Sequence, residues 1–152
     1  MTVKTIYAAE CGFVPDLKAD QSAVLQAIFD GIEYSDGQEV CLQFKRGTYY
    51  ISKAIKINNA KNLTVRGNGA TVVAHFDGTA PVALNNDVFC LGDCDDIAFF
   101  DLFFDLGDNG YGFFGAKRHI DKVVLHIDDK QGFFHMTSDR CLLNSFVSTN
   151  RL

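Results

Sequence analysis

A run of aspartates in the middle of the chain is the feature best suited to chemistry. Between Arg66 and Lys117 there is no lysine or arginine, and the aspartates there are Asp77, Asp87, Asp93, Asp95, Asp96, Asp101, Asp105 and Asp108. Two carboxylates about 5–10 Å apart could serve a glycosidase as acid and base or nucleophile, and several could bind Ca²⁺ through their oxygens. Aspartate also fits sharp turns, so a structural role is the alternative. Asp101 and Asp105, which follow an expected strand, are the best candidates for catalytic carboxylates.

Two histidines stand beside charged residues. Alternation along residues 123–127 points His126 outward, and two aspartates follow it. An outward imidazole beside carboxylates could transfer protons near neutral pH, although a plain surface histidine fits the same pattern. Arg118 and His119 could bind an anionic sugar, or lie in a solvated turn.

Phenylalanine is unusually frequent, with 14 copies and pairs at 99–100, 103–104, 113–114 and 133–134. We expect the inward member of each pair to pack in the core. The outward member could form a subunit interface or stack on a sugar, although Trp and Tyr usually serve better there because they tolerate water.

The five cysteines match no zinc-binding spacing, and no metal site is predicted from them. Three of them stand in apolar runs, so we expect free thiols that pack as small hydrophobic side chains. Free thiols indicate folding in a reducing compartment, and the start of the sequence lacks the apolar segment of a signal peptide. We expect synthesis in the cytoplasm, with later incorporation into a virion or release outside the cell left open.

Composition limits the classes of protein that fit. The 152 residues suit one domain, and the 47% apolar share can build a core. The net charge of −5 argues against a nucleic-acid partner. The sequence contains no run of 18 apolar residues, so it predicts no membrane-spanning segment.

One helix is predicted, over residues 20–34. Asp20 can cap it, and Ala23, Val24, Ala27, Ile28 and Ile32 share one face at helical spacing. After it, short strands are separated by Gly, Asn and Asp turns, which predicts a mainly β structure.

A weak repeat runs through the second part of the chain. Residues 63–65, 97–99, 123–125 and 141–143 form one series of similar apolar triplets, each preceded by a polar residue. Periods of roughly 20–25 residues with several short strands suggest a solenoid, in which stacked coils bury the face that one coil cannot.

Three segments in the first half resemble the N-terminal part of the pectate-lyase-like right-handed parallel β-helix proteins. They are the opening at 7–22, which leads into the helix, then 40–52 (VCLQFKRGTYYIS) and 63–71 (LTVRGNGAT). Their order and spacing agree with the family over residues 7–74. The departures are Pro15-Asp16-Leu17 for Gly-Asp-Gly, Gln21 for one Asp of a pair, and Lys45-Arg46 for Pro-Ala.

The resemblance implies a fold. We expect a mainly β protein that is a right-handed parallel β-helix with a capping helix at 20–34. Residues 1–38 would hold the N-terminal strand and helix, and residues 39–152 the β-helix coils, as the start of a longer solenoid in a single domain. Gly47 and Gly67 then stand as turn residues that need a positive φ.

The resemblance also implies a class of function. Members of this superfamily mostly act on polysaccharides as lyases, hydrolases, epimerases or phage tailspike depolymerases, and we expect a chain that binds and cleaves a polysaccharide. The reaction type, and whether catalysis occurs within this chain, stay open, because the matched motifs are architectural. Asp101, Asp105 and His126 are the catalytic candidates, and Arg118 and His119 the substrate-binding ones. A homotrimer would fit a tailspike, and the alternative is a non-catalytic β-helix for virion assembly or adhesion.

Overall fold

The computed structural model describes residues 2–74, 87–105, 117–125, 133–137 and 141–142. In these ranges the chain is mainly β, with one α-helix and one short 3-10 helix. The elements, in chain order, are β1 (Thr2–Tyr7), η1 (Ala8–Cys11), α1 (Ser22–Asp30), β2 (Gln38–Gln43), β3 (Thr48–Tyr50), β4 (Ile55–Asn58), β5 (Lys61–Val73), β6 (Asp87–Gly92), β7 (Asp95–Asp105), β8 (Lys117–Leu125), β9 (Phe133–Thr137) and β10 (Cys141–Leu142).

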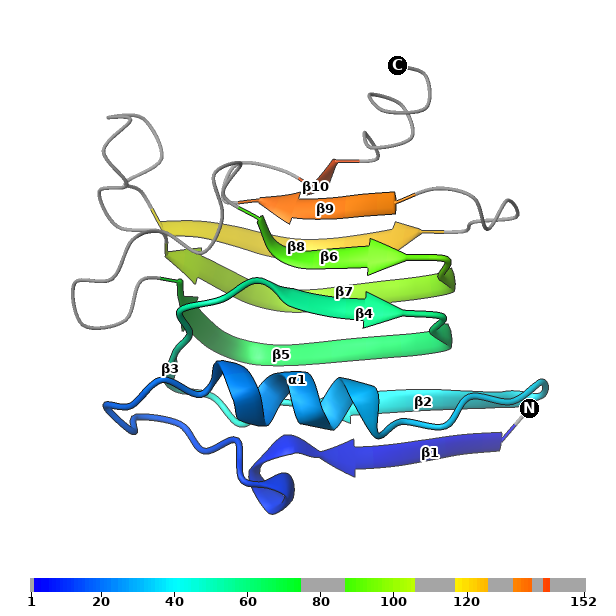
Figure 1. The fold of residues 1–152 in the computed structure, drawn as a ribbon, viewed down its shortest axis with the longest axis horizontal. Helices are drawn as coiled ribbons and strands as arrows, with labels where there is room; N and C mark the ends of the chain where they lie inside the picture. The colour runs from blue at the N-terminus through cyan, green and yellow to red at the C-terminus, as the bar shows by residue number, and fades with distance from the viewer. Residues whose placement is uncertain (1, 75–86, 106–116, 126–132, 138–140, 143–152) are drawn as a thin grey trace.

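The strands form two sheets. Sheet A has the order β1-β2-β5-β7-β8, with β3 also paired to β5, and sheet B has the order β4-β6-β9-β10. In sheet A the strands β1, β2, β5 and β7 run parallel to one another, and in sheet B β4 is parallel to β6 (Figure 1). The chain passes from β4 directly into β5 and from β6 directly into β7, so each passage carries it from sheet B to sheet A.

The expected parallel stacking stops at β6 and β7. Strand β8 runs antiparallel to β7, and β9 runs antiparallel to β6. A parallel neighbour in the same sheet needs a crossover of about a dozen residues or more, usually through another element. Only residues 106–116 separate β7 from β8, which suits an antiparallel return.

The expected helix is present but shorter than 20–34, because it ends at Gly31. The N-cap position is Gln21 and not Asp20 as predicted, and its side chain makes no capping bond. Asp20 lies one residue earlier, and its Oδ1 accepts hydrogen bonds from the Ser22 backbone N–H (2.9 Å) and the Ser22 hydroxyl (2.6 Å). The Ser52 hydroxyl donates to the other oxygen of Asp20, which ties the helix to the loop between β3 and β4.

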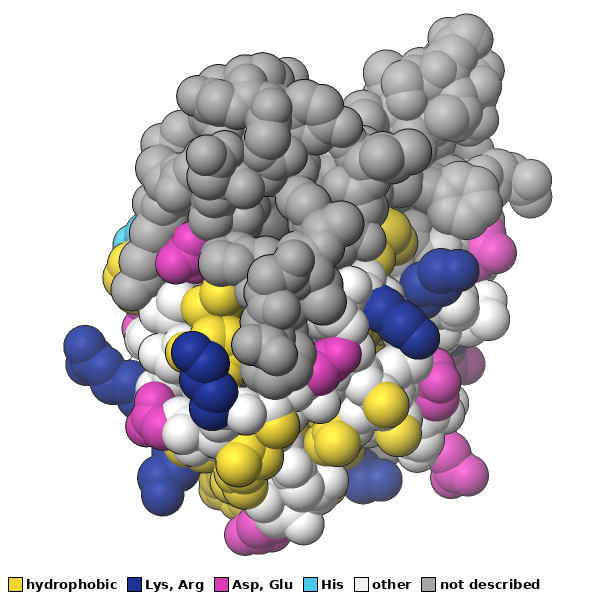
Figure 2. Space-filling view, turned by 60° about the vertical axis from the view of Figure 1, so that its left-hand side comes forward, with side chains coloured by type: hydrophobic (Ala, Val, Ile, Leu, Met, Phe, Trp, Pro, Cys, Tyr) yellow, Lys and Arg dark blue, Asp and Glu magenta, His cyan; other side chains and the backbone are white. Residues whose placement is uncertain are grey.

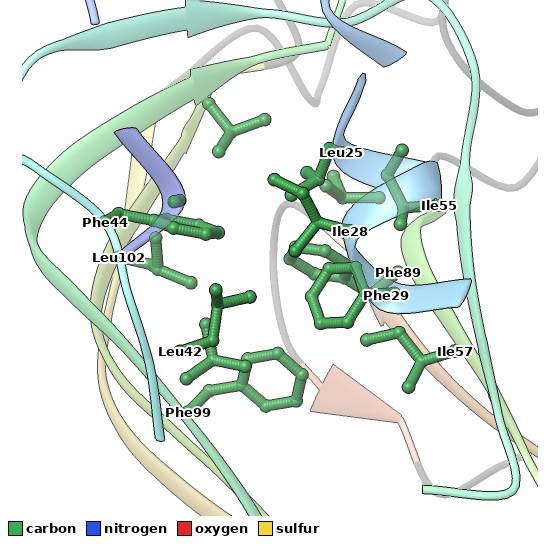
Figure 3. Packing of buried hydrophobic residues seen from close by; sticks show 14 of the residues in the cluster. Leu25, Ile28, Phe29, Leu42, Phe44, Ile55, Ile57, Phe89, Phe99 and Leu102 are labelled. Carbon is green, nitrogen blue, oxygen red and sulfur yellow. The ribbon is translucent and has the colours of Figure 1, made fainter. Parts of the chain in front are cut away.

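The core lies between sheet A on one side and α1 with sheet B on the other. In Figure 3, Leu25, Ile28 and Phe29 of α1 point toward Leu42 and Phe99 of sheet A. Phe89 of β6 joins the two layers, since its ring lies 5.9 Å from that of Phe29 and 5.4 Å from that of Phe99.

Helix α1 also covers the edge of sheet B. The side-chain amide of Gln26 donates to the backbone C=O of Lys56 in β4 (2.8 Å) and accepts from its N–H (2.8 Å), as a neighbouring strand would. Gln21 makes the same pair of bonds to Val14, at 2.8 and 3.0 Å. These amides satisfy backbone groups that a sheet edge or a loop otherwise leaves unpaired.

The two passages from sheet B to sheet A share one backbone design. Asn59 and Asn62 in the first, and Asp93 and Asp96 in the second, all have φ between 53 and 58°. The registers of β4 with β6 and of β5 with β7 set Asn59 level with Asp93 and Asn62 level with Asp96. Asn and Asp are the non-glycine residues that best tolerate this left-handed conformation.

Gly47 has the positive φ expected of it, 146°, but Gly67 does not. Residues 67–69 lie inside β5, where these three residues face the single β7 residue Asp101, rather than in a turn between two strands. A Cβ on Gly67 would lie 2.3 Å from the backbone oxygen of Asp101. Gly67 is therefore required by the close approach of β7.

Candidate functional site

The outer face of sheet A carries a row of side chains that crosses the strands. Strand register places Tyr7, Gln43, Arg66, Phe100 and Lys122 side by side on β1, β2, β5, β7 and β8. We call these five residues the outer row. Leu42, Val65 and Phe99, which precede the row's β2, β5 and β7 members, are fully buried, so alternation turns those members to the surface, where Tyr7 and Lys122 are exposed as well.

Phe100 lies between the two cationic side chains of the outer row, Arg66 and Lys122. The Arg66 guanidinium carbon lies 4.6 Å from the centroid of its ring, and the Lys122 ammonium lies 5.9 Å from it. Both distances suit a cation–π interaction. The ring is only partly buried, whereas Arg66 and Lys122 are exposed. This end of the row therefore offers two cations held by one aromatic ring.

A hollow of about 280 Å³ lies at the other end of the outer row. Tyr7 and Gln43 line it together with Glu10 and Lys45. Asn68 extends the polar surface, because its amide donates to the Phe44 carbonyl at 2.9 Å and to Gln43 Oε1 at 3.3 Å. Hydrogen-bonding groups thus adjoin the cations along one line.

Beside the outer row, Asp101 and His119 form a hydrogen-bonded pair. His119 Nε2 lies 2.8 Å from Asp101 Oδ1, and the two side chains are 40% and 49% exposed. The His119 ring also stacks on Phe103, with centroids 4.2 Å apart and planes 19° from parallel. A carboxylate at Nε2 favours the tautomer that leaves Nδ1 able to accept a proton.

The backbone explains how Asp101 reaches its partner. Asp101 has φ 53° and lies where the register of β5 and β7 shifts, opposite Gly67. The irregularity breaks the strict alternation of β7. Asp101 therefore reaches His119, although the register places Phe103 directly opposite that histidine.

Of the residues predicted from the sequence, Asp101 and His119 are brought together. Asp105 lies at the far end of β7, in register with Lys117, and its carbonyl accepts from the Ala74 N–H at 2.8 Å. Arg118 occupies the register position opposite the buried Phe104. His126 lies outside the described residues.

The aspartates do not gather into a metal site in the described ranges. No group of three His, Cys, Asp or Glu side chains there could hold a metal ion. Asp93, Asp96 and Asp101 instead occupy left-handed backbone positions, which supports the structural alternative for much of the acidic run.

The cysteines divide by position. Cys41 and Cys94 are buried, Cys90 is partly buried, and Cys11 is exposed; these four are free thiols. Burial raises the pKa of Cys94 to about 11, so its thiol stays protonated and packs as a core residue. Of the three cysteines in apolar runs, Cys41 is buried as expected, Cys90 is only partly buried, and the side chain of Cys141 lies outside the described part of the chain.

Four members of the outer row were missed by the sequence reasoning. They lie in no chemical motif and become neighbours only through strand register: Tyr7, Gln43, Arg66 and Lys122. The repeat did contain one signal, because Arg66 follows the triplet 63–65 as Phe100 follows 97–99. Figure 2 shows, on the face seen there, Lys and Arg side chains interspersed with acidic and hydrophobic ones.

Comparison with known proteins gives no relative. No family model matches the chain, and neither a curated protein nor a solved structure matches it. No helix in the described part of the chain is long and apolar enough to cross a membrane.

Proposed function

We propose that the chain forms a right-handed parallel β-helix and that it binds a polysaccharide along the outer row. The parallel ladders support the fold. Ile55 lies beside Phe89 in sheet B, and Leu63 lies beside Ile97 in sheet A, so both sheets advance by 34 residues over this coil. That step is longer than the 20–25 residues expected from the repeat, whereas the step from β2 to β5 in sheet A, 23 residues, falls within that range. Parallel crossovers in one sheet are right-handed in nearly all proteins.

The observation that carries the binding proposal is the outer row itself. Neighbouring strands are ~4.8 Å apart, so the four steps from Tyr7 to Lys122 span about 19 Å. Along this line stand two aromatic rings, an amide and two cations. The exposed Tyr7 ring can stack on a sugar ring and the Gln43 amide can bond to hydroxyls. Arg66 and Lys122, which Phe100 holds in place, can pair with carboxylates or sulfates. An extended anionic glycan lying across the strands satisfies all of them.

Cleavage is assigned to the Asp101–His119 pair. A histidine oriented by a carboxylate can take a proton from a sugar hydroxyl, an activated water or a ring carbon. The pair lies next to Phe100, so a glycan on the outer row would pass beside it. Asp105, at the far end of β7, has no part in this assignment.

Affinity electrophoresis of the full chain in gels containing polygalacturonate tests the binding, with neutral dextran as the comparison polymer. We expect polygalacturonate to retard the protein and dextran to leave it unretarded. Lys122→Ala should weaken binding about tenfold, equivalent to about 1.4 kcal/mol. Lys56→Ala removes the same charge from an exposed residue of β4, away from the outer row, and serves as the matched control. Equal retardation of both variants, or none of the wild type, would contradict the proposal.

The second candidate is a non-catalytic β-helix for virion assembly or adhesion. One observation favours it: Asp93 and Asp96 lie at corners with positive φ, which accounts for them without catalysis. Incubation with polygalacturonate separates the two functions. New reducing ends or unsaturated products that disappear in His119→Ala would support cleavage, whereas binding without products would support adhesion.

A further inference from the structure

Strand β1 presents an open edge of sheet A. In the described part of the chain its only strand partner is β2, along the register Thr2 with Gln38 to Tyr7 with Gln43. The Thr2 N–H donates to the Gly37 carbonyl at 3.0 Å, which shows that Thr2 turns its backbone toward β2. Along such a strand, the backbone N–H and C=O groups of one residue point to the paired strand, and those of the next residue point away from it. Val3, Thr5 and Tyr7 therefore turn their N–H and C=O groups to the free edge.

The same strand is conspicuous for its side chains. Among the described residues the exposed large hydrophobic side chains are Val3 (59%), Tyr7 (51%) and Leu17 (45%), and the first two lie on the outer face of β1. Exposed apolar side chains beside unpaired backbone groups are typical of a surface that receives another strand.

We infer that β1 pairs antiparallel with β1 of a second copy of this chain, with Thr5 opposite Thr5 on a two-fold axis. Val3 then lies opposite Tyr7 of the other copy, and the reverse pair follows by symmetry. All free N–H and C=O groups of Val3, Thr5 and Tyr7 find partners, because these residues form the hydrogen-bonded pairs of the antiparallel ladder. The outer-face contacts become a β-branched side chain against an aromatic ring and threonine against threonine, both favourable cross-strand pairs.

Other registers fit less well. Moving the axis to Lys4 sets two ammonium groups directly opposite each other and leaves the backbone of Tyr7 without a partner on β1 of the other copy. With the axis at Thr5, Lys4 lies opposite Ile6 of the second copy. Ile6 lines an apolar groove of about 460 Å³ between β1 and α1, where Val24 and Ile28 also stand. The methylenes of Lys4 can cover the mouth of this groove while the ammonium stays in water.

A single added strand buries less surface than a standard interface, so we expect a weak dimer with a Kd in the micromolar range. Sedimentation equilibrium of the full chain from about 5 to 500 µM tests this. Thr5→Pro removes an N–H that faces the free edge and leaves every β1–β2 hydrogen bond in place, so it should weaken the dimer at least tenfold. Thr5→Val keeps that N–H and is the matched control.

Hydrogen exchange of the wild type gives a test that needs no variant. The amides of Val3, Thr5 and Tyr7 should become protected as the concentration rises, while those of Lys4 and Ile6 are protected throughout by β2. A monomer at every concentration, a trimer, a dimer that Thr5→Pro leaves intact, or concentration-independent exchange at Thr5 would overturn the inference.

Discussion

Replacing Gly67 should destabilise the protein by pushing β5 and β7 apart. A Cβ at this position would lie 2.3 Å from the Asp101 backbone oxygen and 2.5 Å from two side-chain carbons of Leu102, whereas ordinary contacts begin near 3.4 Å. The strands would have to separate by about 1 Å where Asp101 is held for His119. Neither strand can yield easily, because Leu102 is fully buried.

The magnitude follows from the type of strain. Overpacking a close-packed site costs about 1–3 kcal/mol, occasionally more; because one clashing atom is backbone, we expect about 3 kcal/mol for Gly67→Ala. Gly37 is the matched control, since its φ is +76° and its Cβ would meet nothing within 4 Å. Gly37→Ala should cost about 1 kcal/mol, from the left-handed backbone alone.

Asparagine variants distinguish steric overlap with β7 from strain in a left-handed backbone. Asparagine tolerates a left-handed backbone, so Gly37→Asn should be milder than Gly37→Ala, whereas Gly67→Asn should be at least as damaging as Gly67→Ala. Urea unfolding with an unchanged m-value measures the four differences, and the His119 ring resonances report on the pair with Asp101. A Gly67→Ala variant within about 0.5 kcal/mol of the wild type, or a Gly67→Asn variant milder than Gly67→Ala, would refute the close-approach reasoning.

Three further predictions concern the core and the helix. Gln21→Met removes both bonds from its buried amide to Val14 and should cost about 2–4 kcal/mol, against about 1 kcal/mol for Gln26→Met, whose bonds are exposed; urea unfolding compares them, and equal losses would contradict the burial argument. Burial raises the pKa of Asp20, but hydrogen bonds from two serines outweigh it and leave the pKa below 3.8. The stabilisation is therefore complete above about pH 4 and lost as the pH falls through the folded pKa, so Asp20→Asn should flatten the acid limb of the stability curve, and an unchanged limb would contradict this. Phe89→Ala should cost about 3–5 kcal/mol in thermal unfolding through the cavity between the layers, and a cost below 1 kcal/mol would contradict the packing.

Local features of the fold followed from the sequence because local physics determines them. The helix and the strands before residue 74 depend on periodicity and turn residues a few positions apart. The end of the helix was placed too late, because the apolar spacing continues to Ile32 after Gly31 has ended the hydrogen bonding. The direction of β8 was not predictable from the apolar triplets, since a parallel and an antiparallel strand bury the same alternating residues.

The candidate site was harder to predict because it depends on register. Asp101 and His119 were each selected for their chemistry, but their contact requires β8 to return antiparallel along β7. Asp105 resembled Asp101 in its sequence surroundings, but strand register pairs it with Lys117 at the end of β7. Arg66 belongs to the candidate site because its guanidinium lies over Phe100 on the next strand. Apart from the weak repeat, no pattern within either segment predicts that the two residues are neighbours.

In the aspartate run, residues that the backbone conformation requires look like catalytic carboxylates in the sequence. Asn59 and Asn62 stand at the first passage between the sheets, and Asp93 and Asp96 stand at the same places in the second, with the same sign of φ. Either residue type satisfies a left-handed corner, so the change from amide to carboxylate adds charge without altering the backbone. Asp101 shares this conformation, and its Oδ1 also lies 2.8 Å from His119 Nε2 on the neighbouring strand. Its contact with a histidine, rather than the density of carboxylates, is therefore what selects Asp101 as the catalytic candidate.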